Sequence, residues 1–232
     1  CGTNFTDVIS VEGSNTWRVY MNDTAGNLNG TESVTFFVDS ITPLIDYTTG
    51  TENNNTTFAR NWVFVNVTVT ETNEDTITFV LFNSTSQVNI TSFTDSTRTI
   101  NFTDLPDEIY TYNVTVNDTA GNSNTTETRF ITLDTTSPDV QFVTPTTSSD
   151  NLSQSFIEAN VTASDTNLDT ITIFLYNSTG LVQQNTSSTS PLFVNFTGLP
   201  DETYSLNSTV NDTAGNTNQT ETRTIILDTT PP

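Results

Sequence analysis

The stretch YTYNVTVNDTAGN, residues 110–122, decides the fold of this chain. Apolar and polar residues alternate over its first seven positions, which predicts a β-strand with one buried face and one exposed face. The following Asn-Asp-Thr-Ala-Gly-Asn predicts a tight turn, because Gly121 permits a positive φ and Asn and Asp tolerate one. A second strand is expected over Thr126–Leu133, so the stretch predicts a β-hairpin.

The same hairpin is written three times in the chain. It returns as YSLNSTVNDTAGN at 204–216 and, with more substitutions, as NTWRVYMNDTAGN at 15–27. The turn blocks begin at Asn22, Asn117 and Asn211, which are 95 and then 94 residues apart. Repeats of that length are whole small domains, each able to bury its own core. Helical periodicity is absent and Thr, Val, Ile, Phe and Tyr fill the ordered stretches, so we expect an all-β chain.

The repeats divide the chain into three domains, at 1–39, 40–135 and 136–232. The second and third each contain seven short stretches with strand character, which predicts a sandwich of two sheets. The strands expected before the hairpin are 44–47, 62–70, 76–82, 87–90 and 98–102 in the second domain, and 140–143, 156–163, 170–176, 181–184 and 192–196 in the third.

The first domain is incomplete. Asn4–Asp7 matches 101–104 and 195–198, which belong to the later part of a repeat, so residues 1–39 supply only the last three strands. An open sheet of this kind is marginal in water and prone to pair at its edges. Either the segment was cut from a longer polypeptide, or a neighbouring copy supplies the missing strands. The apolar side left uncovered consists of Trp17, Val19, Met21, Phe36 and Val38.

The charge is strongly acidic, with 27 carboxylates, five arginines and neither lysine nor histidine, giving a net charge of −22. Binding nucleic acid requires clustered cations, so this class of function is excluded. The acidity is consistent with solubility, with adaptation to high salt or with cation binding. Cys1 is the only cysteine, so no disulfide forms within the chain. No signal peptide and no apolar run long enough to span a bilayer is visible.

Enzymatic chemistry is not expected. The missing histidine excludes Ser-His-Asp and Cys-His catalysis and the usual His/Cys zinc sites. Adjacent acids occur at Asp107/Glu108 and at Asp201/Glu202 and could in principle act on glycosides. They occupy the same turn in both repeats, however, and adjacent turn residues rarely converge on one substrate. We interpret them as solvated corners between strands.

The hairpins, together with LDTTSP at 133–138 and LDTTPP at 227–232, resemble tandem bacterial and archaeal immunoglobulin-like repeats. The resemblance implies Greek-key, seven-stranded β-sandwiches in the extracellular stalks of adhesins, in surface-layer proteins or in fibres. It also implies that Tyr110 and Tyr204 form tyrosine corners, in which the hydroxyl bonds back to the chain. The first repeat has Asn15 at this position, and the cysteines and core tryptophan of antibody domains are absent.

Two loops and two linkers predict calcium sites. The segments 71–75 and 165–169 carry oxygen-bearing side chains at alternate positions, in loops at the same end as the Asn-Asp-Thr-Ala-Gly-Asn turn and the incoming linker. Calcium takes six to eight oxygen ligands, and an ion there would stiffen the hinge between domains. The alternative is that these are ordinary turn residues. One expected set is Asp134, Asp165, Asn167, Asp169 and Asp212, and the other is Asp39, Glu71, Asn73, Asp75 and Asp118.

Asn-x-Ser/Thr triplets are unusually dense and predict N-linked glycans on a surface-exposed, archaeal or eukaryotic protein. Several of the asparagines fall on the outward phase of their strands. The alternative is a polar surface that is never modified. Twenty of the 28 asparagines head such a triplet: Asn4, Asn22, Asn29, Asn54, Asn55, Asn66, Asn83, Asn89, Asn101, Asn113, Asn117, Asn124, Asn151, Asn160, Asn177, Asn185, Asn195, Asn207, Asn211 and Asn218.

Two classes of function remain open. The first is a structural component of an extracellular cell-surface array, such as a stalk, a surface layer or a filament. Its partners would be further copies of itself or flanking repeats, joined in one version by strand complementation. The second is an adhesin module that binds a glycan or a partner cell surface. A binder should carry one repeat with divergent, aromatic end loops, whereas these loops are nearly copied, which favours the structural class.

Overall fold

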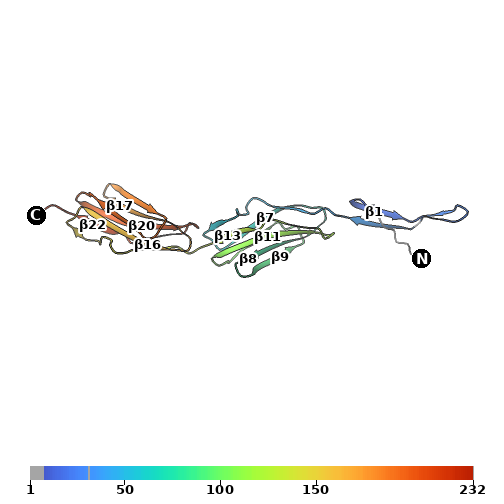
Figure 1. Ribbon diagram of the computed structural model, residues 1–232, viewed down its shortest axis with the longest axis horizontal. Helices are drawn as coiled ribbons and strands as arrows, with labels where there is room; N and C mark the ends of the chain where they lie inside the picture. Colours follow the sequence, from blue (N-terminus) through green and yellow to red (C-terminus); the bar gives the residue numbers. More distant parts are fainter. Residues whose placement is uncertain (1–7, 31, 232) are drawn as a thin grey trace. The chain divides into compact units, whose positions relative to one another are not determined.

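A computed structural model describes residues 8–30 and 32–231 (Figure 1). These residues form strands, turns and irregular segments, and none of them is helical, which confirms the predicted all-β class. In this part of the chain no helix is long and apolar enough to cross a membrane. The strand match predicted at Asn4–Asp7 lies outside the described residues.

The chain divides into two compact units, and the division passes through the second repeat. Unit 1 comprises Cys1–Glu52, Phe64–Asn101 and Thr111–Arg129, and unit 2 comprises Asn53–Val63, Phe102–Tyr110 and Phe130–Pro232. Among the described residues, two groups of three carboxylates lie close enough together to share a metal ion. One group, Asp39, Glu71 and Asp118, lies within unit 1, and the other, Asp134, Asp165 and Asp212, lies within unit 2.

The first repeat is an open sheet, as its sequence predicts. Strand β1 (Gly13–Arg18) pairs with β4 (Ser33–Val38), and β2 (Met21–Asn22) pairs with β3 (Leu28–Asn29). The two hairpin strands expected here are described as four short strands, because the first is interrupted between Arg18 and Met21 and the second between Asn29 and Ser33. The Trp17 ring meets Phe36 edge to face, yet 44% of Trp17 stays exposed. No described strand covers this apolar side.

The second repeat contains two sheets. The first has the order β10-β7-β5, and the second has the order β6-β13-β11-β8-β9, with β12 paired to β11 (Figure 1). The strands are β5 (Leu44–Tyr47), β6 (Thr56–Phe58), β7 (Val63–Thr70), β8 (Glu74–Phe82), β9 (Gln87–Phe93), β10 (Thr99–Phe102), β11 (Glu108–Asp118), β12 (Ser123–Thr125) and β13 (Arg129–Leu133).

The third repeat has the same topology as the second. Its sheets have the orders β14-β16-β19 and β15-β22-β20-β17-β18, with β21 paired to β20. The strands are β14 (Asp139–Phe142), β15 (Asn151–Leu152), β16 (Phe156–Ser164), β17 (Leu168–Asn177), β18 (Gly180–Ser187), β19 (Leu192–Thr197), β20 (Glu202–Asp212), β21 (Thr217–Gln219) and β22 (Arg223–Leu227).

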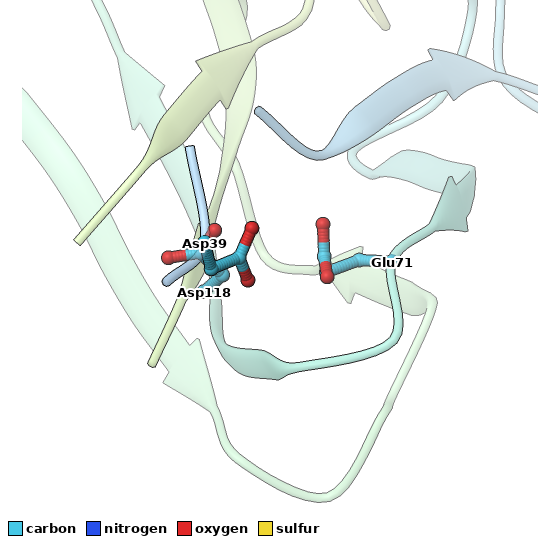
Figure 2. A group of neighbouring side chains, drawn as sticks. All are labelled: Asp39, Glu71 and Asp118. Carbon is cyan, nitrogen blue, oxygen red and sulfur yellow. The ribbon is translucent and has the colours of Figure 1, made fainter. Parts of the chain in front are cut away.

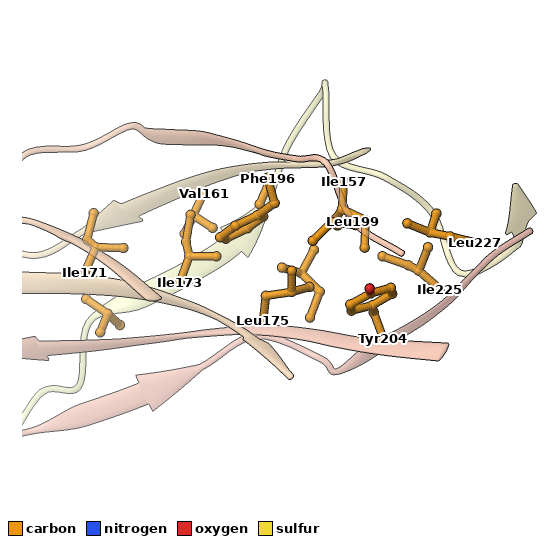
Figure 3. Packing of buried hydrophobic residues seen from close by; sticks show 13 residues of the cluster. Ile157, Val161, Ile171, Ile173, Leu175, Phe196, Leu199, Tyr204, Ile225 and Leu227 are labelled. Carbon is orange, nitrogen blue, oxygen red and sulfur yellow. The ribbon is translucent and has the colours of Figure 1, made fainter. Parts of the chain in front are cut away.

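The third repeat buries one core between its two sheets (Figure 3). Ile157 and Val161 from β16 face Ile173 from β17 and Leu206 from β20, and each is fully buried. Burying an aliphatic side chain of this size stabilises the fold by roughly 1.5–3 kcal/mol. The sandwich is therefore held by apolar contacts between sheets, as the alternating sequence predicts.

The alternation of the first hairpin strand also places an aspartate on its buried face, at the last position of the strand. In β11 the buried positions run from Tyr110 by twos to Asp118, and in β20 they run from Tyr204 by twos to Asp212. A period of two places every second side chain on the same face, whatever its chemistry. The strand thus delivers a carboxylate to the edge of each core, beside the turn.

The sequence pattern misses details after that turn. One strand is expected over Thr126–Leu133, but Thr126 lies between β12 and β13 and bonds the backbone of Val114, donating from its amide and accepting at its hydroxyl (2.9 and 3.0 Å). The segments β6 and β15 have the composition of polar loop, yet they pair in parallel with β13 and β22. Both are only two or three residues long, too short to show a period.

Candidate metal centre

The Asn-Asp-Thr-Ala-Gly-Asn turn holds its aspartate through backbone and side-chain donors. Asp118 is 3% exposed, and its Oδ1 accepts from the amides of Ala120 (2.9 Å) and Asn122 (2.8 Å). Its Oδ2 accepts from Asn122 Nδ2 at 2.7 Å, and Gly121 has a φ of 94°. Burial by itself raises the pKa of Asp118, but these hydrogen bonds outweigh it and lower the pKa, so the carboxylate is charged.

The other two turns have the same design. Asp212, 2% exposed, accepts from Gly215 and Asn216 amides and from Asn216 Nδ2 at 2.7–2.9 Å. Asp23 accepts from the amides of Ala25 and Asn27 and from Asn27 Nδ2 at 2.7–2.9 Å. These hydrogen bonds lower the pKa of Asp23, and the one from the Asn27 side chain makes the largest contribution. Asp23 differs in being exposed.

The linker that enters each complete repeat is fastened to this turn. Asn122 uses its second Nδ2 hydrogen on the backbone oxygen of Asp39 (3.1 Å), and Asn73 Nδ2 donates to Asp39 Oδ2 (2.9 Å). Asn124 Nδ2 donates to the carbonyl of Pro43, four residues further along the linker (2.9 Å). The third repeat repeats all three contacts, with Asn216 and Asn167 on Asp134 (2.8 and 2.6 Å) and Asn218 on Pro138 (2.9 Å).

These contacts bring three carboxylates together at each linker. Oxygens of Asp39, Glu71 and Asp118 lie within 4.8 Å of one another (Figure 2). Two oxygens bound to one calcium ion at roughly 2.3–2.6 Å lie at most about 5 Å apart, so the spacing fits a shared cation. The second cluster consists of Asp134, Asp165 and Asp212 and meets the same spacing.

Arginine does not neutralise either cluster through any ion pair of the described residues. Arg98 pairs with Glu74, and Arg129 and Arg223 pair with the neighbouring Glu127 and Glu221. Asp134, at 6% exposed, is buried along with Asp212 in the second cluster. Like charges held this close in a poorly hydrated place repel, and a bound cation relieves that repulsion.

Four of the ten predicted ligand positions do not provide a carboxylate to the clusters. Asn73 and Asn167 donate to the linker aspartates through Nδ2, which leaves their Oδ1 atoms as the oxygens they could offer an ion. Asp75 and Asp169 are exposed and belong to β8 and β17. Asp169 Oδ2 instead accepts from Asn211 Nδ2 at 3.0 Å.

Asp107 and Asp201, the aspartates of the Asp-Glu corners, accept hydrogen bonds from the segment that follows each repeat. Asp107 accepts from the hydroxyls of Thr135 (2.9 Å) and Thr136 (2.8 Å). Asp201 accepts from the Thr229 amide and hydroxyl (3.0 and 2.9 Å) and from the Thr230 hydroxyl (2.9 Å). In the first repeat Glu12 takes this place and binds the amide and hydroxyl of Ser40. Sequence reasoning missed this role, although the repeated Asp-Thr-Thr after each repeat was visible.

The tyrosine corners predicted from the resemblance are confirmed. Tyr110 Oη donates to the Pro106 carbonyl at 2.9 Å, and Tyr204 Oη donates to the Pro200 carbonyl at 3.0 Å. Asn15 occupies this position in the first repeat and also bonds four residues back, to Val11 O at 2.6 Å. The shorter side chain therefore preserves the turn without filling a core.

The described Asn-x-Ser/Thr asparagines differ in burial and in whether Nδ2 donates a hydrogen bond. Asn66 and Asn160 lie on the outward phase of β7 and β16 and are half-buried, and their Nδ2 atoms, where a glycan would be attached, donate to the carbonyls of Thr49 and Thr144. Asn4 lies outside the described residues. The exposed asparagines whose Nδ2 donates no hydrogen bond to another described residue are Asn22, Asn54, Asn55, Asn89, Asn101, Asn151 and Asn195.

The fold and the linker contacts define a class of protein: a tandem array of immunoglobulin-like β-sandwiches joined by short, fastened linkers. The matching sequence family is the bacterial Ig-like domain, found at residues 64–135 and again at 136–229. These matches cover more than half of the chain, and the chain belongs to this family.

Three solved structures are similar to this chain at low sequence identity. A marsupial T cell receptor is 10% identical with a TM-score of 0.55, covering 82% of this chain and 74% of that one. Fibronectin(III)-like modules of Clostridium thermocellum CbhA are 11% identical (TM-score 0.44, 80% and 94% covered). A 1.5-MDa bacterial ice-binding adhesin is 18% identical (TM-score 0.39, 81% and 65% covered). No curated protein matches the chain in sequence.

Proposed function

We propose that this chain is a structural segment of an extracellular cell-surface array, such as a stalk, a surface layer or a filament, with no catalytic activity. One observation carries the proposal: both linkers are fastened by the same contacts to the equivalent turn, and each contributes its aspartate to a cluster of three carboxylates. An array that spaces or coats benefits from identical joints, whereas a binding or catalytic protein needs a site that differs from its neighbours.

Calcium is the ion we propose for these joints. Asp39, Glu71 and Asp118 would hold one ion, and the second cluster would hold another, with backbone carbonyls and water completing the shell. Hard oxygen ligands in loops suit calcium. The ion would tie the linker aspartate to two loops of the following repeat, so that the linker becomes less mobile.

A calcium titration of thermal unfolding tests this proposal. Ligand that binds only the folded state stabilises it by about 2.7 kcal/mol at a hundredfold excess over Kd, so calcium should raise the Tm and a chelator should reverse the rise. An unchanged Tm would contradict the calcium sites. Magnesium at the same concentration serves as a control, because it demands a tighter octahedral shell.

The variant Glu71→Gln sharpens the test because glutamine keeps the Oε1 acceptor for the amides of Thr72 and Asn73. Without calcium the variant should unfold at a higher temperature than the wild type, since one repelling charge is gone. With calcium it should bind the ion about tenfold more weakly or worse. Asp75→Asn is the matched control: Asp75 is exposed and outside the cluster, so this variant should match the wild type in both conditions.

We also propose N-linked glycans on the exposed asparagines, including Asn89, Asn101 and Asn195. Their side chains reach solvent, and the sheet surface around them is rich in Thr and Asn. Glycopeptide mapping of native material should find glycans at these positions and none at Asn66 or Asn160, whose Nδ2 atoms are engaged. Bare peptide mass at every triplet would refute the modification.

A glycan-binding adhesin module is the second candidate, and one observation favours it. Phe174 and Tyr176 stack on the outer face of β17, with centroids 6.0 Å apart and planes 21° apart, and the second repeat has Val80 and Phe82 in their places. This pair of half-exposed rings, which the second repeat lacks, could stack on sugar rings. A glycan array tests it: specific binding that Phe174→Ala and Tyr176→Ala abolish would favour the adhesin over the structural role.

A further inference from the structure

One edge of the larger sheet in the third repeat is open. β18 is the last strand in the order β15-β22-β20-β17-β18, and among the described residues its strand partner is β17 alone. The backbone N–H and C=O groups on its other side are therefore left without a strand partner. Such a row is a template for pairing with another strand, and proteins usually block it with a proline, a charged side chain or a very short strand.

β18 has none of these protections. Its eight residues, Gly180–Ser187, read GLVQQNTS and include neither a charged residue nor a proline. The four consecutive side chains from Leu181 to Gln184 are exposed, and two of them are apolar. A neutral, partly apolar edge of this length favours the addition of a further strand, with main-chain hydrogen bonds supplying the contact.

The chain around β18 is also uncharged, which distinguishes the third repeat from the second. No charged residue occurs from 170 to 200, whereas the equivalent stretch, 76–106, contains Asp95, Arg98 and Asp104. The whole chain has a net charge of −22, so two copies repel each other over most of their surfaces. At this flank two copies can touch without bringing like charges into contact.

Glycans distinguish the two repeats in the same direction. β9, the equivalent edge strand of the second repeat, carries Asn89, an exposed Asn-x-Thr asparagine for which we propose a glycan. On β18 the Asn-x-Ser asparagine is Asn185, whose Nδ2 is buried and has no hydrogen-bond partner among the described residues. A buried Nδ2 is out of reach for modification in the folded chain. A bulky glycan would therefore cover β9 and leave β18 bare.

We propose that β18 of one copy pairs antiparallel with β18 of a second copy, so that two larger sheets join into one across a two-fold axis. Charge identifies the occupant: a cationic partner would favour the acidic surfaces of the chain, whereas a neutral edge favours another neutral edge, which a second copy provides. The same surface is used on both copies, so the contact closes as a dimer. It uses no carboxylate of the two candidate metal centres and goes beyond the proposed function.

The two-fold axis determines which side chains meet. Side chains alternate between the two faces of a strand, and a continuous sheet pairs like face with like face. Gln184 lies in the middle of β18, opposite Phe174 of β17, so it comes to lie directly or diagonally opposite its own copy. Glu202 accepts hydrogen bonds from Asn177 and Ser178 at the turn before β18. Antiparallel pairing keeps the two copies of this charge at opposite ends of the contact.

Sedimentation of the full chain without glycans, over a range of concentrations and salt, tests the proposal. The wild type should dimerise as its concentration rises, and more tightly in high salt, because salt screens the repulsion between two acidic chains. Gln184→Glu and Gln184→Lys each bring two like charges together and should weaken dimerisation about tenfold. Gln184 is exposed, so both variants should fold. Gln141→Glu, the same change at an exposed position on β14 at the edge of the smaller sheet, should dimerise like the wild type.

Mixing the two charged variants provides the decisive arm. The Gln184→Glu and Gln184→Lys copies place opposite charges side by side, so an equimolar mixture should dimerise at least as tightly as the wild type. A contact elsewhere on the chain gives no such restoration. The proposal would be overturned by a wild type that is monomeric at every concentration and salt, by a Gln184→Glu variant that dimerises like the wild type, or by a mixture no tighter than its components.

The same samples separate this inference from the proposed function. At matched ionic strength the dimer should form equally in calcium and in chelator, because no carboxylate of the two metal centres takes part. A calcium-dependent Tm with a monomeric wild type would support the joints and refute the pairing of β18, and a dimer without any calcium effect on the Tm would do the reverse. Dimerisation that Ile90→Lys on β9 abolishes and Gln184→Glu leaves intact would place the contact on the second repeat and refute the pairing of β18.

Discussion

The first and third repeats contain the same hairpin in two different surroundings. Asp23 and Asp212 accept the same set of hydrogen bonds, from an asparagine four residues later and from backbone amides of the turn. Asp212 is 2% exposed, while Asp23 is open to solvent. The turn therefore forms from local chemistry alone, without the rest of the sandwich.

Burial and the gathering of charge depend on strands from elsewhere in the repeat. In the third repeat β20 is paired on both sides, by β17 and by β22, and β16 covers its apolar face. In the first repeat β1 has β4 as its described partner, and Trp17 remains partly exposed. A carboxylate becomes part of a candidate metal centre when the other sheet and the linker close around its turn.

Truncating an apolar side chain should reveal the largest difference between the two repeats, measured as the loss in free energy of unfolding. Ile173 is fully buried in the third repeat, so Ile173→Ala should cost about 2–5 kcal/mol through lost burial and the cavity left behind. Val34 is largely exposed on β4, so Val34→Ala should lower the free energy of unfolding by less than about 0.5 kcal/mol. Chemical denaturation followed by tyrosine and tryptophan fluorescence measures both, and equal costs would mean that the first repeat is covered in solution.

The turn carboxylates should give the next largest difference. Asp212→Asn removes the acceptor of Asn216 Nδ2 inside a buried site and should cost about 1–3 kcal/mol in calcium. The same change at Asp23 faces water, which replaces the lost partner, so it should leave the unfolding temperature close to that of the wild type. Thermal unfolding of the two variants in calcium provides the measurement. A large effect at Asp23 would show that its turn is buried by a partner.

Those parts of the site that follow from a strand period can be predicted from the sequence. Tyr204, Leu206 and Val210 set the phase, and counting on by two reaches Asp212, so the period alone places this residue at the edge of the core. Asp75 shows the limit of that reasoning. The composition of its loop suggested a metal ligand. In the structure β8 begins at Glu74, and the alternation of this strand places Asp75 on the exposed face.

The long-range hydrogen bonds of the asparagine side chains could not be predicted from the sequence. Asn122 fastens a carbonyl 83 residues earlier, and no local pattern states which backbone oxygen an amide will meet. The hydrogen bond between Thr135 and Asp107 joins residues 28 positions apart and could not be predicted for the same reason. Such contacts become visible when the repeats are compared, because each recurs at the equivalent positions.

The tyrosine corner should contribute a smaller effect. Tyr204→Phe removes the hydrogen bond to the exposed Pro200, whose carbonyl water can then reach, so it should cost about 0.5–1.5 kcal/mol. Asn15→Ala removes the corresponding bond in the first repeat and should leave the main unfolding transition within about 0.5 kcal/mol of the wild type, because no core rests on it. A cost at Tyr204 as large as that of Ile173→Ala would mean that the ring packing had changed as well.

Acid titration should show the turn of the first repeat behaving like the turn of a complete repeat, here that of the second repeat, which makes it the most demanding test of the comparison. Hydrogen bonds lower the pKa of both Asp23 and Asp118 from an ordinary value of 3.8. The folded state thus binds fewer protons than the unfolded state near that pH, and stability rises with pH there. The contribution is complete above about pH 4 and is lost as the pH falls through the lowered pKa values.

Carboxyl chemical shifts recorded by NMR in chelator measure these pKa values one residue at a time. Both should fall below 3.8, and Asn27→Ala should return Asp23 toward it while leaving Asp118 unchanged, because each turn supplies its own donors. If Asp23 titrated normally in the wild type while Asp118 remained low, the turn would owe its geometry to the surrounding sandwich, and the local origin of the hairpin would be refuted.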